Sequence, residues 1–193
     1  MSTAVIRWLA VAFALFHVYN NWFTAVSELW FAAIHFGGFG ALCALTFHRP
    51  EQDVDRHRVQ EAFSVLLALL SVSVAVYLIF FEDALYVRES EFVAADYWFS
   101  AIAVLLSMEF ARRTSGWFMP ALIAVSLCYI LFLGRYIPGV FAFPGLSLET
   151  VLYRSYWSGD GMLGMVANIS STFVFMFILF GAFRLKSGAG DFI

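Results

Sequence analysis

Charged residues are scarce in this sequence of 193 residues, of which only 13% are Asp, Glu, Lys or Arg. A soluble domain carries about 25%. Hydrophobic residues instead make up 62% of the chain, and the mean hydropathy is +0.83. The shortage of charge excludes a water-soluble globular domain, and the abundance of apolar residues excludes a disordered chain. The sequence therefore predicts an integral membrane protein.

Basic residues and cysteines are few as well. The formal net charge is −3, so the chain offers no basic surface to nucleic acid. The two cysteines, Cys43 and Cys128, lie in apolar stretches and provide neither a disulfide framework nor a CxxC metal pattern. The motifs GxSxG and HExxH, the P-loop and paired catalytic carboxylates are absent from the sequence. We therefore expect no enzyme activity, no catalytic residue and no metal site.

Long apolar runs dominate the sequence. A helix needs about 20 mostly apolar residues to cross a bilayer. Six runs reach that length, at residues 4–23, 29–47, 62–81, 92–111, 117–137 and 162–183. We predict an all-α integral membrane protein with about six transmembrane helices. The fourth run is the weakest of the six, because Asp96 and Glu109 must lie near its two ends.

Lysine and arginine are distributed unevenly among the connections. Both residues concentrate on the cytoplasmic side of membrane proteins, so their positions predict orientation. With the N-terminus inside, the cytoplasmic side holds eight of them, namely Arg7, Arg49, Arg56, Arg58, Arg112, Arg113, Arg184 and Lys186. The outer side holds three, Arg88, Arg135 and Arg154. We therefore expect both the N-terminus and the C-terminus to be cytoplasmic.

The connections differ in kind. Residues 48–61 carry mixed charge and predict a cytoplasmic loop. Residues 82–96 hold five acids against Arg88 alone and predict an outer loop. Within the longer segment 138–160, residues 146–157 predict a short helix along the outer interface, capped by Ser147. The chain stops just beyond the sixth run, and we expect it to be a fragment of a longer protein.

Two histidines lie inside apolar runs at matched depth, since His17 and His35 are each six residues from the outer ends of adjacent runs. Ionisable groups in a membrane are costly, so each is a functional candidate. Two imidazoles on adjacent helices could ligate a haem, as in a membrane cytochrome b. The chain would then be a small haem-binding or assembly membrane protein. The alternative is a pair of histidines hydrogen-bonded to neighbouring helices.

Other polar and small residues predict contacts between helices. Glu109 precedes Arg112 and Arg113 by three and four residues, so one helix face can pair the acid with either cation as a structural anchor. Interhelical hydrogen bonds are expected from a polar patch in the sixth run, and close helix approach from a glycine cluster in the second. These two sets are Asn168, Ser170, Ser171 and Thr172, and Gly37, Gly38 and Gly40.

Four segments in the second half of the chain carry a resemblance to a known family. They are EFARRTSGWFMP at 109–120, GRYIPG at 134–139, GLSLE at 145–149 and GDGMLGMVANISSTFVFMFILFGAFRLKSGAGDF at 159–192. In order and spacing they resemble the fused permease of tripartite ATP-independent periplasmic (TRAP) transporters, in the type that joins a four-helix small subunit to a twelve-helix large subunit (4TM/12TM). The motif residues to which we assign structural roles are Glu109, Arg112, Arg113, Gly116, Trp117, Pro120, Pro138, Gly139, Gly181, Ser187, Gly188 and Gly190.

The resemblance implies a domain organisation. Residues 1–113 would form a small-subunit-like four-helix membrane domain. Residues 114–160 would be the fusion helix and an outer interfacial segment, and residues 161–193 the truncated first helix of the large-subunit transport domain. The implied location is the cytoplasmic (inner) membrane of a bacterium or archaeon, as a multi-pass protein.

The resemblance also implies a function. In this family the large subunit imports an organic acid by an elevator motion coupled to sodium, and a soluble periplasmic binding protein, for the fused type usually of the TAXI class, delivers the substrate. Sodium would be the coupling ion of the full permease, and this fragment would bind no cofactor. Substrate-binding residues are expected beyond residue 193. The implied partners are the binding protein, the remainder of the large subunit and the lipid bilayer. We assign docking of the binding protein to four acids of the outer segment, Glu82, Asp83, Glu89 and Glu91.

Overall fold

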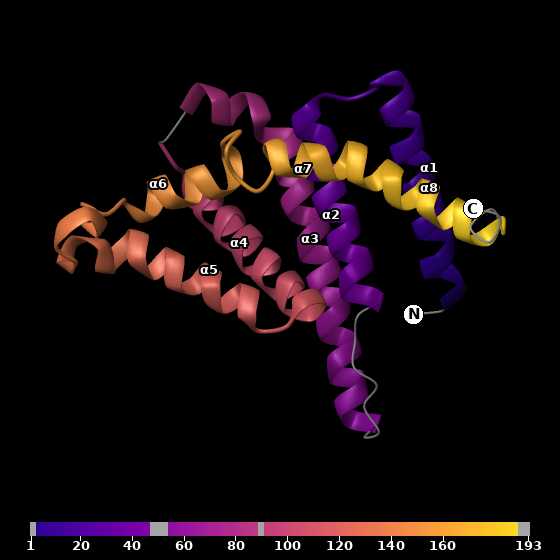
Figure 1. Ribbon diagram of the computed structural model, residues 1–193, viewed down its shortest axis with the longest axis horizontal. Coiled ribbons are helices and arrows are strands. Elements are labelled where there is room, and N and C mark those ends of the chain that lie inside the picture. The colour runs from indigo at the N-terminus through magenta and orange to yellow at the C-terminus, as the bar shows by residue number, and fades with distance from the viewer. Residues whose placement is uncertain (1–2, 47–53, 89–90, 189–193) are drawn as a thin grey trace.

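The computed structural model describes residues 3–46, 54–88 and 91–188, and its regular secondary structure over these ranges is entirely helical (Figure 1). The first four helices are α1 (Thr3–Phe23), α2 (Glu28–Thr46), α3 (Val54–Arg88) and α4 (Ala94–Ser115). Helix α5 (Phe118–Cys128) continues into a π-helical turn at Tyr129–Leu133 and a 3-10 turn at Gly134–Tyr136. The all-α prediction is confirmed.

The remaining elements are short turns followed by one long helical run. A 3-10 turn at Gly139–Phe141 precedes α6 (Leu148–Leu152), which continues as a π-helical turn at Tyr153–Trp157. The last run consists of α7 (Met165–Ile169), a third π-helical turn at Ser170–Val174, and α8 (Phe175–Lys186). The backbone N–H of Thr150 donates to the Ser147 hydroxyl at 3.1 Å, so Ser147 caps α6 as predicted.

Five helical segments of the described residues are long and apolar enough to cross a membrane: Glu28–Thr46, Arg58–Arg88, Ala94–Ser115, Phe118–Tyr136 and Met165–Lys186. The chain is thus a multi-pass membrane protein by composition. The first predicted run does form a helix, α1, but it is not among the five. Polar side chains make it less apolar than the sequence length alone suggested, because it carries Arg7, His17, Asn20 and Asn21.

Helix α3 is longer than the sequence predicted. It begins at Val54 and ends at Arg88, so parts of both predicted loops, 54–61 and 82–88, are helical. The rest of the first predicted loop, residues 48–53, lies outside the described residues. The end of an apolar run marks where a helix leaves the hydrocarbon of the membrane. The helix itself can continue into water, because Glu, Leu, Ala and Arg all favour helix there. Arg88 in the last turn adds a favourable interaction with the helix dipole.

The α2–α3 pair forms the centre of the core, and small residues make it possible. Ala32, Ala33 and Ala44 of α2 are fully buried. A Cβ on Gly37 would lie 2.7 Å from the Cβ of Ala75 on α3, so only glycine fits there. The Ser71 hydroxyl donates to the Gly37 carbonyl at 3.1 Å. The close approach predicted for this glycine cluster is confirmed.

The segment after α6 reaches into this core, which the sequence did not predict. The hydroxyl of the fully buried Tyr156 donates to the Val74 carbonyl of α3 at 2.6 Å. Burial raises the pKa of this hydroxyl, so it acts as a neutral donor. The indole N–H of Trp157 donates to the Ser100 hydroxyl of α4 at 2.9 Å. Residues 153–157 therefore lie against α3 and α4 rather than only along an interface.

Helices α5 and α8 extend away from this core. Figure 1 shows α2 and α3 side by side near its centre, with the α5 run and the α7–α8 run crossing the view at a steep angle to them on opposite sides. Pro120 is the only buried residue of α5, and α8 has none. Both helices thus present most of their apolar surface outward.

Candidate functional site

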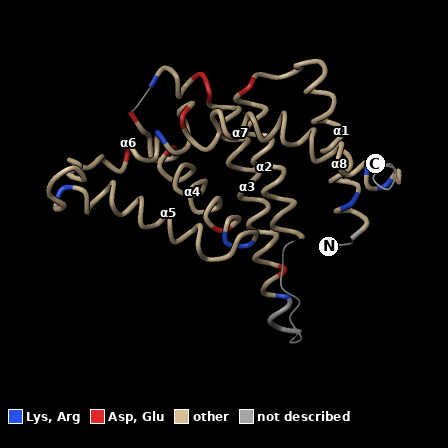
Figure 2. The backbone as a smooth tube through the Cα atoms, viewed as in Figure 1, with Lys and Arg blue, Asp and Glu red and all other residues tan. Residues whose placement is uncertain are grey.

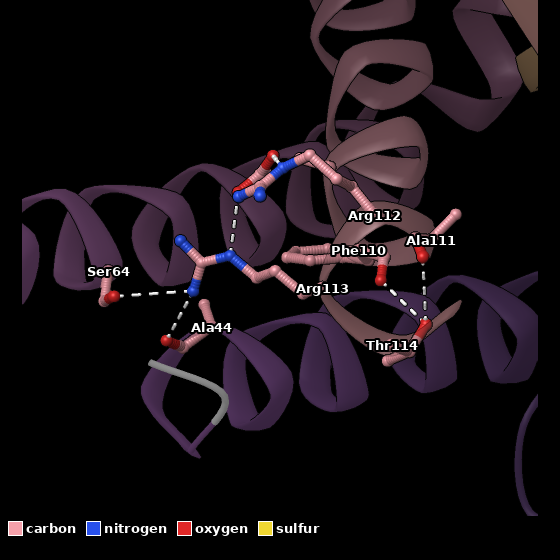
Figure 3. A network of polar contacts seen from close by, with 8 residues as sticks. Ala44, Ser64, Phe110, Ala111, Arg112, Arg113 and Thr114 are labelled. Atoms are coloured by element: carbon pink, nitrogen blue, oxygen red, sulfur yellow. Dashed lines mark hydrogen bonds and ion pairs between the residues drawn. The ribbon is translucent and has the colours of Figure 1, made fainter. Parts of the chain in front are cut away.

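An anchor of three charged residues lies at the C-terminal end of α4 (Figure 3). Arg112 donates two hydrogen bonds of 2.7 Å to the two carboxylate oxygens of Glu109. Arg113 Nε donates to the same carboxylate at 2.8 Å. The sequence predicted a pair with either arginine, and the structure brings both to the one acid.

Arg113 extends the anchor to two other helices. Its Nη1 donates to the carbonyl of Ala44 in the last turn of α2 at 3.0 Å, and to the hydroxyl of Ser64 on α3 at 3.4 Å (Figure 3). A carbonyl at a helix end has no partner within its own helix, so an arginine that binds it satisfies a group that would otherwise be left unpaired. Arg112 lies over the Trp117 ring, 5.3 Å from its centre. The anchor joins α2, α3 and α4 and sets the turn into α5.

The other motif residues lie at helix ends. Gly116 follows α4 with a φ of 80°, and Gly139 has a φ of 82° directly after Pro138, which precedes the 3-10 turn. Pro120 is buried in the first turn of α5, where its missing N–H removes no helical hydrogen bond.

The last motif residues surround the end of α8. Ser187 closes α8 with its N–H on the Phe183 carbonyl at 2.9 Å, and Gly188 follows with a φ of 73°. A side chain at Gly181 would meet no atom within 4 Å, so nothing in the structure explains that glycine. Gly190 lies outside the described residues.

The two membrane histidines form a hydrogen-bonded chain across three helices. His17 Nε2 is 3.0 Å from His35 Nδ1, and His35 Nε2 is 3.1 Å from the Ser170 hydroxyl in the last helical run. His17 Nδ1 contacts the carbonyl of Phe13 at 2.9 Å. His17 is fully buried, and the rings of Phe31 and Phe175 pack against it at 4.9 and 4.7 Å. The chain links α1, α2 and the π-helical turn.

This arrangement does not fit a haem held by both histidines. An iron between two imidazoles needs each nitrogen about 2 Å away, and hence a separation of about 4 Å. The facing nitrogens of His17 and His35 are 3.0 Å apart and bind each other. The second interpretation from the sequence, hydrogen bonds to neighbouring helices, describes the observed contacts.

The polar patch of the last run makes the predicted interhelical bonds in part, because among its side chains only the Ser170 hydroxyl bonds to another helix, at His35. Besides Ser170, the Ser171 carbonyl accepts a hydrogen bond from the Asn21 amide of α1 at 3.1 Å. Ser171 and Thr172 donate their hydroxyls to the Asn168 carbonyl, at 3.1 and 2.6 Å. The patch thus connects α1 and α2 to the last helical run.

A buried ion pair at the other end of α4 was missed by sequence reasoning. Asp96 lies in the first turn of α4, at one end of the fourth predicted run, and its side chain is fully buried. It accepts hydrogen bonds from the Tyr77 hydroxyl at 2.7 Å, from Arg88 Nη2 at 3.0 Å and from the Val93 N–H at 2.9 Å. The sequence did contain a signal for this pair, since Arg88 is the lone base of an acidic segment and a buried carboxylate needs a positively charged partner. The pair holds the end of α3 against the start of α4.

The four acids assigned to docking divide between different environments. Glu82 and Asp83 lie in the last turns of α3, not in a loop. Glu82 accepts a hydrogen bond from the Trp30 indole, whereas Asp83 and Glu91 are exposed. Glu89 lies outside the described residues. Figure 2 shows most of the acidic residues at the end of the molecule where α1 passes into α2, so acidic charge gathers on one end.

A groove of about 1300 Å³ opens at this acidic end. The last helical run supplies one wall, the end of α1 another, and Glu28 of α2 and Glu82 of α3 lie on its rim. Neither its shape nor its lining was predicted from the sequence, because it depends on how far α8 diverges from α2.

Comparisons of the chain with protein-family models, with curated proteins and with solved structures find no match.

Proposed function

We propose that this chain is the N-terminal part of a TRAP-type permease of the fused 4TM/12TM kind. In that role α1 to α4 form the scaffold-like small-subunit domain, α5 is the fusion helix, and the α7–α8 run is the first helix of the transport domain. The complete permease imports an organic acid with sodium, and a periplasmic binding protein delivers the substrate. The chain itself performs no catalysis.

The observation that carries this proposal is the place of the resembling segments in the fold. In the described residues, every glycine with a positive φ lies in one of them; these are Gly116, Gly139, Gly145 and Gly188. Such a φ is strained for residues with a side chain. The resembling segments thus hold the positions that fix where the chain turns, as expected of a shared fold.

The turn before α7 gives the same support. A Cβ on Gly161 would lie 2.5 Å from the Arg154 carbonyl oxygen, and one on Gly164 would overlap the Gly159 carbonyl. Only glycine fits at either position, because backbone atoms cannot move aside as a side chain can. Both residues belong to the GDGMLG part of the most extensive resembling segment.

Charge distribution supports an orientation with both termini inside. The acidic end of the molecule would face the periplasm, and the Glu109–Arg112–Arg113 anchor the cytoplasm. Single cysteines introduced as Glu91→Cys and Arg58→Cys, in a Cys43→Ala, Cys128→Ala background, test this in intact cells. An impermeant thiol reagent should label position 91 and spare position 58. The reverse labelling contradicts the orientation.

The acidic end of the molecule also supports docking of the periplasmic binding protein. Exposed Asp83 and Glu91 would raise the encounter rate with a basic patch on the binding protein, with only a modest effect on affinity. In a complete permease containing this chain, Asp83→Asn with Glu91→Gln should raise the binding-protein concentration for half-maximal uptake by about two- to fivefold at low salt. The maximal rate should stay unchanged, and the difference should vanish at high salt. An unchanged concentration and salt dependence would mean that these acids are merely solvated.

Transport itself gives the decisive experiment. Proteoliposomes with an inward sodium gradient and added binding protein would contain either this chain or the complete permease, and labelled organic acids would report uptake. The complete permease should show uptake that depends on sodium and on binding protein, and the chain alone should show none, because it has no charged site in the middle of its spans. Uptake by the chain alone contradicts the proposal, as does a complete permease that works without sodium or binding protein.

A further inference from the structure

The groove at the acidic end is polar at its rim and apolar along its wall. Four large side chains of the last helical run line it, at positions i, i+3, i+4 and i+7 of one helix face: Phe173, Met176, Phe177 and Phe180. Phe177 is 73% exposed and Phe180 is 68% exposed, so neither is covered by the described residues. These residues lie in the middle of the segment Met165–Lys186, which is long and apolar enough to cross a membrane.

The rim of the groove carries negative charge. Two carboxylates, Glu28 and Glu82, stand at the ends of α2 and α3, beside the hydroxyl of Tyr86 and the amide of Asn168. Among the described residues that line the groove there is no lysine or arginine. A ligand that fits an apolar wall with an acidic rim has long apolar chains and a positively charged group at one end.

We propose that the groove binds a phospholipid with an ammonium headgroup, of the phosphatidylethanolamine class. Its acyl chains lie along the aromatic wall, and its ammonium group contacts Glu28 and Glu82. The volume of about 1300 Å³ exceeds the roughly 300–1,000 Å³ of sites for small ligands, which suits a lipid. Two acids and no base disfavour an anionic lipid such as phosphatidylglycerol.

A protein occupant fits this wall less well. Where helices meet closely in this molecule, small residues face the contact, as Gly37 does against Ala75. The α8 part of the groove wall instead presents phenylalanine and methionine, and the small residues that line the groove, Ser27, Gly159, Gly164 and Thr172, lie outside that helix. Lipid chains adapt to such an uneven surface, whereas a helix needs a close-packed complement.

Native mass spectrometry of the purified chain from bilayers with equal amounts of phosphatidylethanolamine and phosphatidylglycerol tests the proposal. The chain should retain phosphatidylethanolamine over phosphatidylglycerol by about fivefold, as expected for two partly exposed ion pairs. Glu28→Gln with Glu82→Gln should remove most of this preference. The change Glu82→Gln leaves an amide oxygen that can still accept the Trp30 hydrogen bond. The single variant Glu28→Gln, which alters an exposed side chain, should lose part of the preference without touching that bond.

Two further variants separate the contribution of the rim charges to lipid retention from that of the aromatic wall. Asp83→Asn, one residue beyond Glu82 but outside the groove, should keep the full preference. Phe177→Ala with Phe180→Ala should lower the retention of both lipids alike. The proposal is overturned by equal retention of the two lipids, by a preference that survives when both glutamates are replaced, or by a lipid-free dimer or protein complex in which a second chain takes the groove.

Discussion

The α2–α3 pair and the helices α5 and α8 have similar apolar composition but opposite surroundings. Between α2 and α3, alanines and a glycine are buried and the backbones approach closely. On α5 and α8 most side chains are large, and most of the large ones are exposed. Apolarity alone therefore does not distinguish a helix that contacts protein from one that contacts lipid. Residue size does, because association in a membrane depends on close packing and not on removal from water.

Polar groups follow the same division. The core region contains a buried ion pair and a carboxylate that binds two arginines. The hydroxyl of Ser126 on α5 bonds only within its own helix, to Leu122 at 2.9 Å. If this division is correct, substitutions in the core region should cost stability, and matched substitutions on α5 or α8 should not.

The largest effect is expected at Asp96. Asp96→Ala leaves Arg88 and the Tyr77 hydroxyl without their acceptor, and breaking a buried pair in this way costs about 3 kcal/mol or more. Unfolding by sodium dodecyl sulfate, followed by circular dichroism in mixed micelles, measures the loss. Asp83→Ala is the matched control, because Asp83 is exposed near the end of α3. Equal stability of the two variants would show that the ion pair does not join α3 to α4.

A smaller effect is expected from crowding the α2–α3 contact. Gly37→Leu forces atoms against Ala75 and the Ser71 carbonyl, and overpacking of this kind costs about 1–3 kcal/mol. Gly181→Leu makes the same change in α8, where no atom lies within 4 Å of the new Cβ, and should not lower stability, because leucine favours helix over glycine. Thermal denaturation in detergent compares the two. If both variants lose stability to the same extent, α8 packs against something that this chain alone does not show.

The smallest effect concerns the histidine chain. Ser170→Ala removes the partner of His35 Nε2, and an interhelical hydrogen bond in a membrane contributes about 0.6–2 kcal/mol. Ser126→Ala removes a hydroxyl that contacts no other helix and should be neutral. The difference between the two free energies of unfolding isolates the contact between the last run and α2. No difference would mean that the histidines hold this run without the serine.

The sequence predicted the elements of this fold well and their contacts only in part. Run lengths located the helices, Ser147 marked a helix start, and the spacing of Glu109, Arg112 and Arg113 predicted the anchor, because each signal is local. The partner of Asp96 and the insertion of Tyr156 were missed, since both depend on segments distant in the sequence. The extension of α3 was missed because hydropathy reports the membrane boundary rather than the helix end.

The candidate sites show the same limit. The sequence placed His17 and His35 at matched depth, but only the structure shows that their rings bond to each other, at 3.0 Å. The groove could not be predicted at all, because it depends on the angle at which the last run leaves α2. Proline and glycine marked the turns at 138–145, whereas packing angles leave no local signal in the sequence.

The π-helical turn at Ser170–Val174 has a consequence for how this chain can vary. A π turn holds one residue more than an α turn, and each residue of a helix corresponds to a rotation of about 100°. Deletion of one residue there would restore a continuous α-helix and leave the direction of the following residues unchanged, whereas a regular α-helix formed by all the same residues would rotate everything after the turn by about that angle. Ser170 would keep its place beside His35, while the aromatic face of α8 would turn away from α1. The extra residue of this turn therefore sets the rotation of α8 relative to α7. With it, Ser170, which bonds to His35, and the aromatic residues of α8 face the same side of the run.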